Sequence, residues 1–221
     1  FAVLDGKLDH TELGDAIAPQ PDFDDFLALV ARARGQLGDR AVPVVIGPVT
    51  LIALSRFRGD TAVALEALTP HYVTLLEALS ALGVAKVQLH EPILVLSGSD
   101  SLRSAFEAAY ALLATVDLSL NLVTYFDDLG ETYPWVVNLP VDVISLDFTR
   151  GDNLSLIQRH GWPVEKTLVA GVVDGRSVWR ERPDEIRKVL DLLAVALPAD
   201  APLRIGASAS LQFLPYAASR E

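Results

Sequence analysis

The stretch Val141–Phe148 reads VDVISLDF, a short run that is almost continuously apolar and ends on an aspartate and an aromatic residue. Runs of this kind are typical of strands that are buried on both faces of a parallel sheet. Five further runs share this character: Val42–Gly47, Ala85–Leu89, Leu120–Phe126, Thr167–Val173 and Leu203–Ala207. The sequence therefore predicts six strands that belong to a parallel sheet.

Longer amphipathic stretches lie between these runs. Their apolar residues recur at helical spacing, which predicts helices that each cover a sheet with one face. The predicted helices are Phe23–Gly35, Thr61–Leu82, Ser101–Thr115 and Pro183–Leu197. Strands and helices that alternate in this way indicate an α/β fold.

Two α/β architectures compete. A doubly wound sheet usually carries a glycine-rich phosphate loop after its first strand, and the chain contains no such motif. A (β/α)8 barrel of the TIM type instead gathers polar residues where its strands end. The ends of the runs read His90-Glu91-Pro92, Tyr125-Phe126-Asp127, Asp147-Phe148-Thr149, Asp174-Gly175-Arg176 and Ser208-Ala209-Ser210. We therefore favour a barrel, incomplete as the sequence stands because only six strand runs are visible.

Composition excludes several classes of function. The chain has 221 residues, of which 51% are hydrophobic, and 18 basic and 29 acidic residues give a net charge of −11. Nucleic acids and anionic membranes both need a basic surface, so neither is an expected partner. The absence of cysteine excludes thiolate metal sites and a cysteine nucleophile. Apolar runs are shorter than the ~20 residues of a spanning helix, and we expect a cytoplasmic protein.

His90 and Glu91 form the most suggestive local group. An imidazole beside a carboxylate could act as acid and base or bind a metal. However, neighbouring residues of a strand point to opposite faces, so the two side chains enter one pocket only if the strand has already ended. In the alternative interpretation, Glu91 caps a loop amide and His90 packs at the mouth of the barrel.

Asp147 and Asp174 end two later strands and could converge with Glu91 on one face, where carboxylates raise one another's pKa. Alternatively, they form structural ion pairs with Arg150 and Arg176. No catalytic residue and no metal ligand is assigned, because the four histidines are scattered and lack ligand spacing. The candidate residues that line a substrate cleft are His90, Glu91, Tyr125, Asp147, Asp174 and Ser208.

The strand-end motifs, taken in order, resemble one family. Gly47-Pro48-Val49-Thr50 and Gly171-Val172-Val173-Asp174-Gly175-Arg176 with Trp179 are the most specific strings. Together with His90-Glu91-Pro92 and Ser208-Ala209-Ser210, they are similar to the N-terminal barrel of cobalamin-independent methionine synthase. Phe1–Ile17 also resembles the loop after the second strand of that barrel.

The resemblance implies a two-barrel enzyme that moves the methyl group of polyglutamylated 5-methyltetrahydrofolate to homocysteine and so makes methionine. In this family a C-terminal barrel holds the catalytic zinc with a His, a Glu and two Cys. Residues 1–221 would then be one domain that serves as scaffold and cleft wall, with no cofactor of its own. Its partners would be the C-terminal barrel of the same polypeptide and the small-molecule substrates, and the chain alone would be inactive.

The sequence departs from the family at several points. His90 stands where the family has Asp, and Ala209 stands where it has Cys between two serines. The basic motif that helps to hold the folate tail is missing before Phe1. The spacing between Phe1–Ile17 and Val42–Gly47 leaves no room for an intervening strand, so we expect a chain seam between Ile17 and Phe23.

Two other functions stay open. One is a stand-alone barrel that binds a ligand without catalysis. The other is a decarboxylase-type barrel that acts on an acidic tetrapyrrole. The latter needs basic residues at the mouth to hold carboxylates, and only Arg150 and Arg176 qualify.

Overall fold

The structure is a computed structural model that describes residues 21–55 and 60–216. The chain divides into two compact units. The first unit comprises Phe1–Ile93 and Leu102–Asn121, and the second comprises Leu94–Ser101 and Leu122–Glu221. Most of the expected seam, residues 17–20, lies outside the described residues. The expectation of a single domain with a seam therefore stays a prediction.

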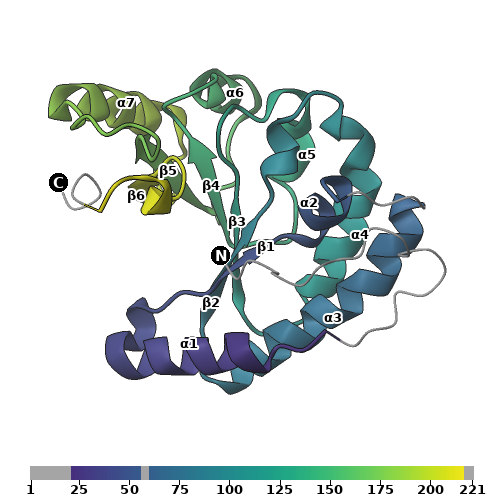
Figure 1. Cartoon of the computed structure of the whole chain (residues 1–221). Helices are drawn as coiled ribbons and strands as arrows, with labels where there is room; N and C mark the ends of the chain where they lie inside the picture. Colours follow the sequence, from purple (N-terminus) through teal and green to yellow (C-terminus); the bar gives the residue numbers. More distant parts are fainter. Residues whose placement is uncertain (1–20, 56–59, 217–221) are drawn as a thin grey trace. The chain divides into compact units, whose positions relative to one another are not determined.

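All six predicted strands are present, and their order in the sheet follows their order in the chain. The β1–β2, β4–β5 and β5–β6 pairs are parallel, which confirms the α/β fold class. Figure 1 shows how strands and helices alternate along the chain, from α1 in purple to β6 in yellow. The strands are β1 (Val44–Ile46), β2 (Lys86–His90), β3 (Ser119–Val123), β4 (Val143–Asp147), β5 (Thr167–Val173) and β6 (Leu203–Ala207).

Burial of the strands depends on their place in the sheet. In β4 and β5 nearly every residue is buried, as the continuous apolar runs predicted. The prediction is wrong for the two outer strands, where Val44 and Ile46 of β1 and Ile205 of β6 are exposed. The reason is that, among the described residues, β1 and β6 stand at the two ends of the strand order and each pairs with one neighbouring strand.

The first unit contains the helices α1 (Asp24–Leu37), α2 (Pro48–Ala53), α3 (Thr61–Ala81) and α4 (Arg103–Leu113), and the 3-10 turn η1 (Gly38–Arg40). Three of these helices confirm predicted ranges to within a few residues. α3 begins where the Asp60 side chain accepts a hydrogen bond from the Ala62 amide at 2.8 Å. It ends before Gly83, which adopts a φ of +77° that few other residues tolerate.

The core of the first unit forms where α3 and α4 cover the apolar face of β2. Val87 and Leu89 of β2 are fully buried, as are Leu76 and Leu79 of α3. Phe106 and Tyr110 of α4 are buried as well, and their rings stack with centroids 5.8 Å apart. Apolar residues at i and i+2 in the strand and i and i+3 or i+4 in the helices produce this packing.

The second unit contains α5 (Tyr133–Val136), α6 (Asn153–His160) and α7 (Pro183–Ala196). Only α7 was predicted, because α5 and α6 are too short for a helical period to stand out. The remaining 3-10 turns are η2 (Pro92–Val95), η3 (Ser99–Leu102), η4 (Gly130–Thr132) and η5 (Leu211–Phe213). No helix within the described residues combines the length and apolar character needed to cross a membrane.

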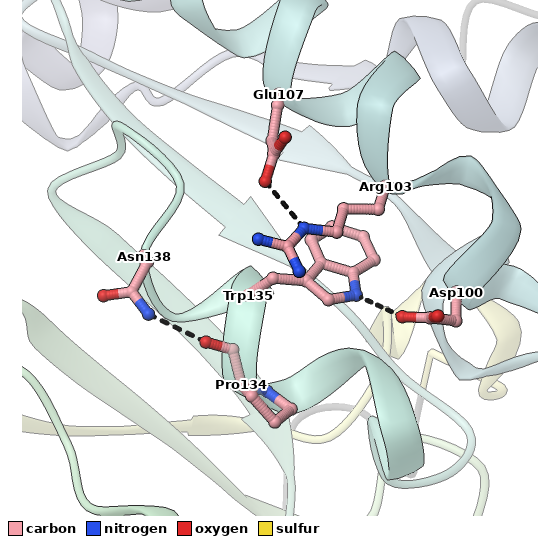
Figure 2. Close-up of polar contacts among 6 residues, drawn as sticks. All are labelled: Asp100, Arg103, Glu107, Pro134, Trp135 and Asn138. Atoms are coloured by element: carbon pink, nitrogen blue, oxygen red, sulfur yellow. Dashed lines mark hydrogen bonds and ion pairs between the residues drawn. The ribbon is translucent and has the colours of Figure 1, made fainter.

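Side-chain contacts fix the short helix α5 (Figure 2). The buried Trp135 donates its indole N–H to Asp100 Oδ1 at 2.8 Å, and Asn138 Nδ2 donates to the Pro134 carbonyl at 2.7 Å. Figure 2 also shows an ion pair between Arg103 and Glu107, one turn apart on the exposed side of α4. Trp135 thus satisfies its polar atom while it buries its ring.

The close approach of backbones at Gly171 yields a stability prediction. A Cβ there would lie 2.8 Å from both the Leu146 carbonyl oxygen and the Ser208 Cα, so Gly171→Ala forces neighbouring backbone to move. We expect a loss of roughly 1–3 kcal/mol in the free energy of unfolding, measured by urea denaturation. The matched control is Gly35→Ala in α1, where a Cβ meets nothing within 4 Å. It should stabilise the chain by up to about 1 kcal/mol, and equal effects of the two changes would contradict the prediction.

Candidate functional site

Glu91 follows β2 directly, and its side chain is completely buried. Its carboxylate accepts hydrogen bonds from the main-chain amides of Val49 at 3.3 Å and Thr50 at 2.7 Å, and from the Tyr110 hydroxyl at 3.2 Å. These two amides belong to the first turn of α2, where a helix leaves its N–H groups without internal partners. Glu91 therefore caps α2 from a distant part of the sequence.

The Gly47-Pro48-Val49-Thr50 string makes this cap possible. Gly47 precedes the helix, and a Cβ at this position would lie only 2.0 Å from Glu91 Oε1. Pro48 occupies the first helical position, where a missing N–H costs nothing. The Thr50 hydroxyl accepts a hydrogen bond from the Ile93 amide at 3.3 Å and ties the loop after Glu91 back to α2. The motif is thus explained by packing around one carboxylate.

Burial raises the pKa of Glu91 to about 7, although the donors on Thr50, Val49 and Tyr110 favour its charged form. Burial also raises the pKa of Tyr110, and the Glu91 charge adds to this effect. Tyr72 donates its hydroxyl to the Ile46 carbonyl at 2.7 Å, and burial with the nearby Glu91 raises its pKa too. The surroundings of Glu91 are therefore apolar and hydrogen-bonded, as the capping interpretation requires.

His90 is turned away from this cap. Its Nε2 lies 3.3 Å from Gln88 Oε1, and the two residues share one face of β2. Burial lowers the pKa of His90 to about 4, so the imidazole is neutral at pH 7. Because Glu91 is occupied by α2, His90 and Glu91 do not form an acid–base pair with each other.

Asp147 of the second unit accepts hydrogen bonds from main-chain amides, as Glu91 does in the first unit. It ends β4 and is completely buried. Its Oδ1 accepts from the Thr149 amide at 2.7 Å, the Thr149 hydroxyl at 2.7 Å and the Arg150 amide at 3.1 Å. Its Oδ2 accepts from the Phe126 amide at 3.1 Å. Asp147 therefore joins the ends of β3 and β4 and contacts Arg150 through the main chain, not through an ion pair.

Asp174 ends β5 and is half-buried. Its carboxylate accepts from the Arg176 amide at 2.9 Å, and its own amide donates to Glu181 Oε1 at 3.0 Å. The guanidinium of Arg176 lies over the Phe126 ring instead, 5.1 Å from the centroid. Asp174 therefore contacts Arg176 through the main chain, and the described residues show no ion pair between the two side chains.

Tyr125 and Ser208 complete the predicted set. The half-buried Tyr125 ring meets the Phe126 ring edge to face, with centroids 4.6 Å apart. Ser208 is buried, and its hydroxyl accepts from the Gly175 amide at 3.3 Å. In the second unit, Tyr125, Asp147, Asp174 and Ser208 thus follow β3 to β6 at the carboxyl ends of the strands. His90 and Glu91 belong to the first unit, and their convergence with this set stays a prediction.

Phe126, Trp179 and Arg176 were not predicted as site residues. Phe126 is a non-glycine residue with a φ of +87°, and Trp179 is 83% exposed on the loop after β5. Arg176 was weighed only as an ion-pair partner, although its guanidinium covers an aromatic ring. The sequence does show aromatic residues directly after strand runs, and this pattern could have pointed to them. However, a local pattern predicts neither the backbone angle of Phe126 nor the exposed fraction of Trp179.

Several of the polar residues at the strand ends are held by hydrogen bonds or by burial. Glu91 and Asp147 are occupied by main-chain donors, and His90 is neutral and half-buried. Within residues 21–55 and 60–216, no three His, Cys, Asp or Glu side chains are grouped as a metal site would need. What the strand ends of the second unit expose is an aromatic and cationic surface.

The raised pKa of Glu91 predicts a pH-dependent stability. The pKa of Glu91 is about 7 in the folded state and 4.5 in the unfolded chain. Protonation of Glu91 therefore stabilises the folded state. This contribution is complete below pH 4.5 and is lost as the pH rises through 7. Between pH 4.5 and 7.5, the free energy of unfolding of the wild type should fall by about 3 kcal/mol relative to Glu91→Gln.

Denaturant unfolding at several pH values checks this prediction. The matched control is Glu77→Gln, which removes an exposed carboxylate of α3. The difference between this control and the wild type should stay constant across the same pH range. Parallel profiles for the wild type and Glu91→Gln would contradict the assignment of the titration to Glu91.

Comparison with known proteins finds relatives that match nearly the whole chain. The relatives include 5-methyltetrahydropteroyltriglutamate–homocysteine methyltransferases from Trichodesmium erythraeum, 50% identical over 95% of this chain, and from Synechococcus, 52% identical over 92% of it. The chain spans only 28% and 26% of the length of these two relatives.

Solved structures support the fold. A B12-independent methionine synthase from Shewanella, solved in complex with selenomethionine, superposes with a TM-score of 0.73. The match covers 88% of this chain and 62% of that chain at 17% identity. At this low identity it supports the fold alone. A second such protein, from Listeria monocytogenes, gives a TM-score of 0.69 over 85% of this chain and 63% of that chain at 12% identity.

The family described as the cobalamin-independent synthase N-terminal domain matches residues 11–197. This range includes the Gly47–Thr50 and Gly171–Arg176 strings, and with them the helix cap at Glu91 and the turn at Asp174. The resemblance inferred from the strand-end motifs is therefore confirmed, and the chain belongs to the family of cobalamin-independent synthase N-terminal domains.

Proposed function

We propose that this chain is the N-terminal barrel of a cobalamin-independent methionine synthase. The whole enzyme would transfer the methyl group of polyglutamylated 5-methyltetrahydrofolate to homocysteine and release methionine. The observation that carries the proposal is the identity of 50% and 52%, over nearly all of this chain, to relatives named as the homocysteine methyltransferase. Because this chain corresponds to about a quarter of their length, the activity is proposed for the longer polypeptide.

Within that enzyme we assign this chain the role of scaffold and cleft wall. The buried carboxylates of Glu91 and Asp147 bind main-chain amides, so they hold loops in place. Ser208 does the same for the turn at Gly175. The partly exposed His90, Tyr125 and Asp174 are the candidates to line the cleft.

The catalytic zinc would lie in the C-terminal barrel of the same polypeptide. A site of one His, one Glu and two Cys does not fit this chain, which contains no cysteine. The described residues also offer no cluster of carboxylates and histidines in its place. Zinc, when bound in the other barrel, would activate the thiol of homocysteine, and this chain would bind and orient the remaining partners.

The expected partners are the C-terminal barrel, methyl-folate and homocysteine, and the expected compartment is the cytoplasm. The decarboxylase alternative gains no support, because it needs arginines directed at carboxylates of a substrate. Arg176 instead lies on Phe126, and Arg150 is exposed beyond the turn that Asp147 holds.

We expect the full-length polypeptide to make methionine from homocysteine and the triglutamate form of 5-methyltetrahydrofolate, and the 221-residue chain to make none. Product formation is followed by mass spectrometry, with full-length protein carrying an alanine at each cysteine of the C-terminal barrel as the inactive control. A full-length protein that binds methyl-folate without turnover would instead support a non-catalytic barrel.

Metal analysis gives an independent prediction. The purified 221-residue chain should hold far less than one zinc per molecule after exhaustive dialysis, because it lacks thiolates and a histidine–carboxylate cluster within its described residues. The full-length protein should hold about one. Stoichiometric, dialysis-resistant zinc in the 221-residue chain would contradict the assignment of the metal to the other barrel.

A further inference from the structure

Glu91 is a completely buried carboxyl group without a cation beside it. None of the ion pairs within residues 21–55 and 60–216 involves Glu91. A buried charge without a counter-charge is costly, and hydrogen bonds offset only part of this cost. Ionisable groups kept in such surroundings are concentrated at functional positions. The ionisation of Glu91 therefore changes the free energy of the contacts that enclose it.

Several elements of the first unit pack around Glu91. α2 presents two main-chain amides, α4 presents the Tyr110 hydroxyl, and α3 presents Tyr72, whose hydroxyl donates to a carbonyl of β1. The His90 side chain of β2 is turned away toward Gln88. α2, β1 and η2 contain no titratable side chain. Among the described residues, the two tyrosines are therefore the titratable groups that face Glu91. Both stay neutral at pH 7, because burial raises their pKa.

Of the helices around Glu91, α2 opens most easily. It has six residues, whereas α3 has 21 and α4 has 11. A short helix has few internal hydrogen bonds, and local opening begins with the least stable segments. Glu91 itself holds the first turn of α2, and the Thr50 hydroxyl joins α2 to the loop after Glu91. When α2 moves away, water therefore reaches the carboxyl group.

We propose that Glu91 is a pH-sensitive switch: its neutral acid keeps α2 closed, and its charged carboxylate favours local opening of α2. The neutral acid still accepts hydrogen bonds from the two amides. In the closed state burial raises the pKa of Glu91 to about 7, whereas a carboxyl group in water has a pKa of 4.5. The closed state therefore binds the proton more tightly, and a rise in pH favours the open state. Since α2 follows β1 directly, the switch couples pH to the end of the strand where barrels place functional loops.

Amide hydrogen exchange of the full-length polypeptide, read by mass spectrometry of its peptides, measures the opening of α2. Protection is the intrinsic exchange rate divided by the observed rate at the same pH. From pH 5.5 to pH 8.0, the protection of residues 49–54 should fall about 25-fold, as the two pKa values of Glu91 require. Residues 75–82 of α3 should stay at least about tenfold more protected at each pH, because they open only with the whole unit. Constant protection of α2, or equal protection of α2 and α3, overturns the proposal.

Two variants assign the titration to Glu91. Glu91→Gln removes the ionisable group, so the protection of residues 49–54 should stay within about twofold over the same pH range. The matched control is Glu77→Gln, which removes an exposed carboxylate of α3 and should keep the fall of the wild type. A fall of about 25-fold that persists in Glu91→Gln overturns the proposal, because another group then controls α2.

Tyr110→Phe tests the switch even where Glu91→Gln fails to fold. This change removes the hydroxyl that donates to Glu91 at 3.2 Å and favours its charged form. The pKa of Glu91 then rises further, so the protection of residues 49–54 should level off at a higher pH than in the wild type. A profile that is unchanged or shifted to lower pH overturns the proposal. These measurements read amide exchange alone, and their outcome is independent of the proposed function.

Discussion

The segments that follow β1, β3 and β4 have main-chain N–H groups that no longer have a strand partner, and two buried carboxylates accept hydrogen bonds from them. An amide left without an acceptor in the interior costs about 1–3 kcal/mol, so the acceptor determines whether the loop is held. Glu91 accepts from the first turn of α2, and Asp147 accepts from the turn after β4 and from Phe126. Gly47 leaves room where a side chain would collide with the Glu91 carboxylate.

These hydrogen bonds also bear on what the two carboxylates do. Hydrogen bonds from neighbouring loops and helices occupy most of the acceptor positions of Glu91 and Asp147. Glu91 and Asp147 are therefore explained by the loops that they hold in place. What the strand ends of the second unit offer instead is a rigid platform, with Phe126 fixed in a strained conformation and Arg176 above it.

The sequence alone determined the fold class, the six strands and the family. Strand identity is local, because a buried strand must be apolar along its whole length and the stretch from residue 141 to residue 148 shows this directly. α3 and α7 were likewise predictable from apolar spacing, since they are long enough for several helical turns. The short helices α2, α5 and α6 were not, because one or two turns carry too few periodic positions.

Only the tertiary structure decided what each strand-end residue does. Whether Glu91 caps a helix or faces a substrate depends on the amides of Val49 and Thr50, more than 40 positions earlier in the chain. Whether Arg176 pairs with Asp174 or covers Phe126 depends on how two loops from different strands meet. The sequence fixes a residue's chemistry and its place along its own strand. Its partners are set by contacts between segments that are distant in sequence, and no local pattern encodes them.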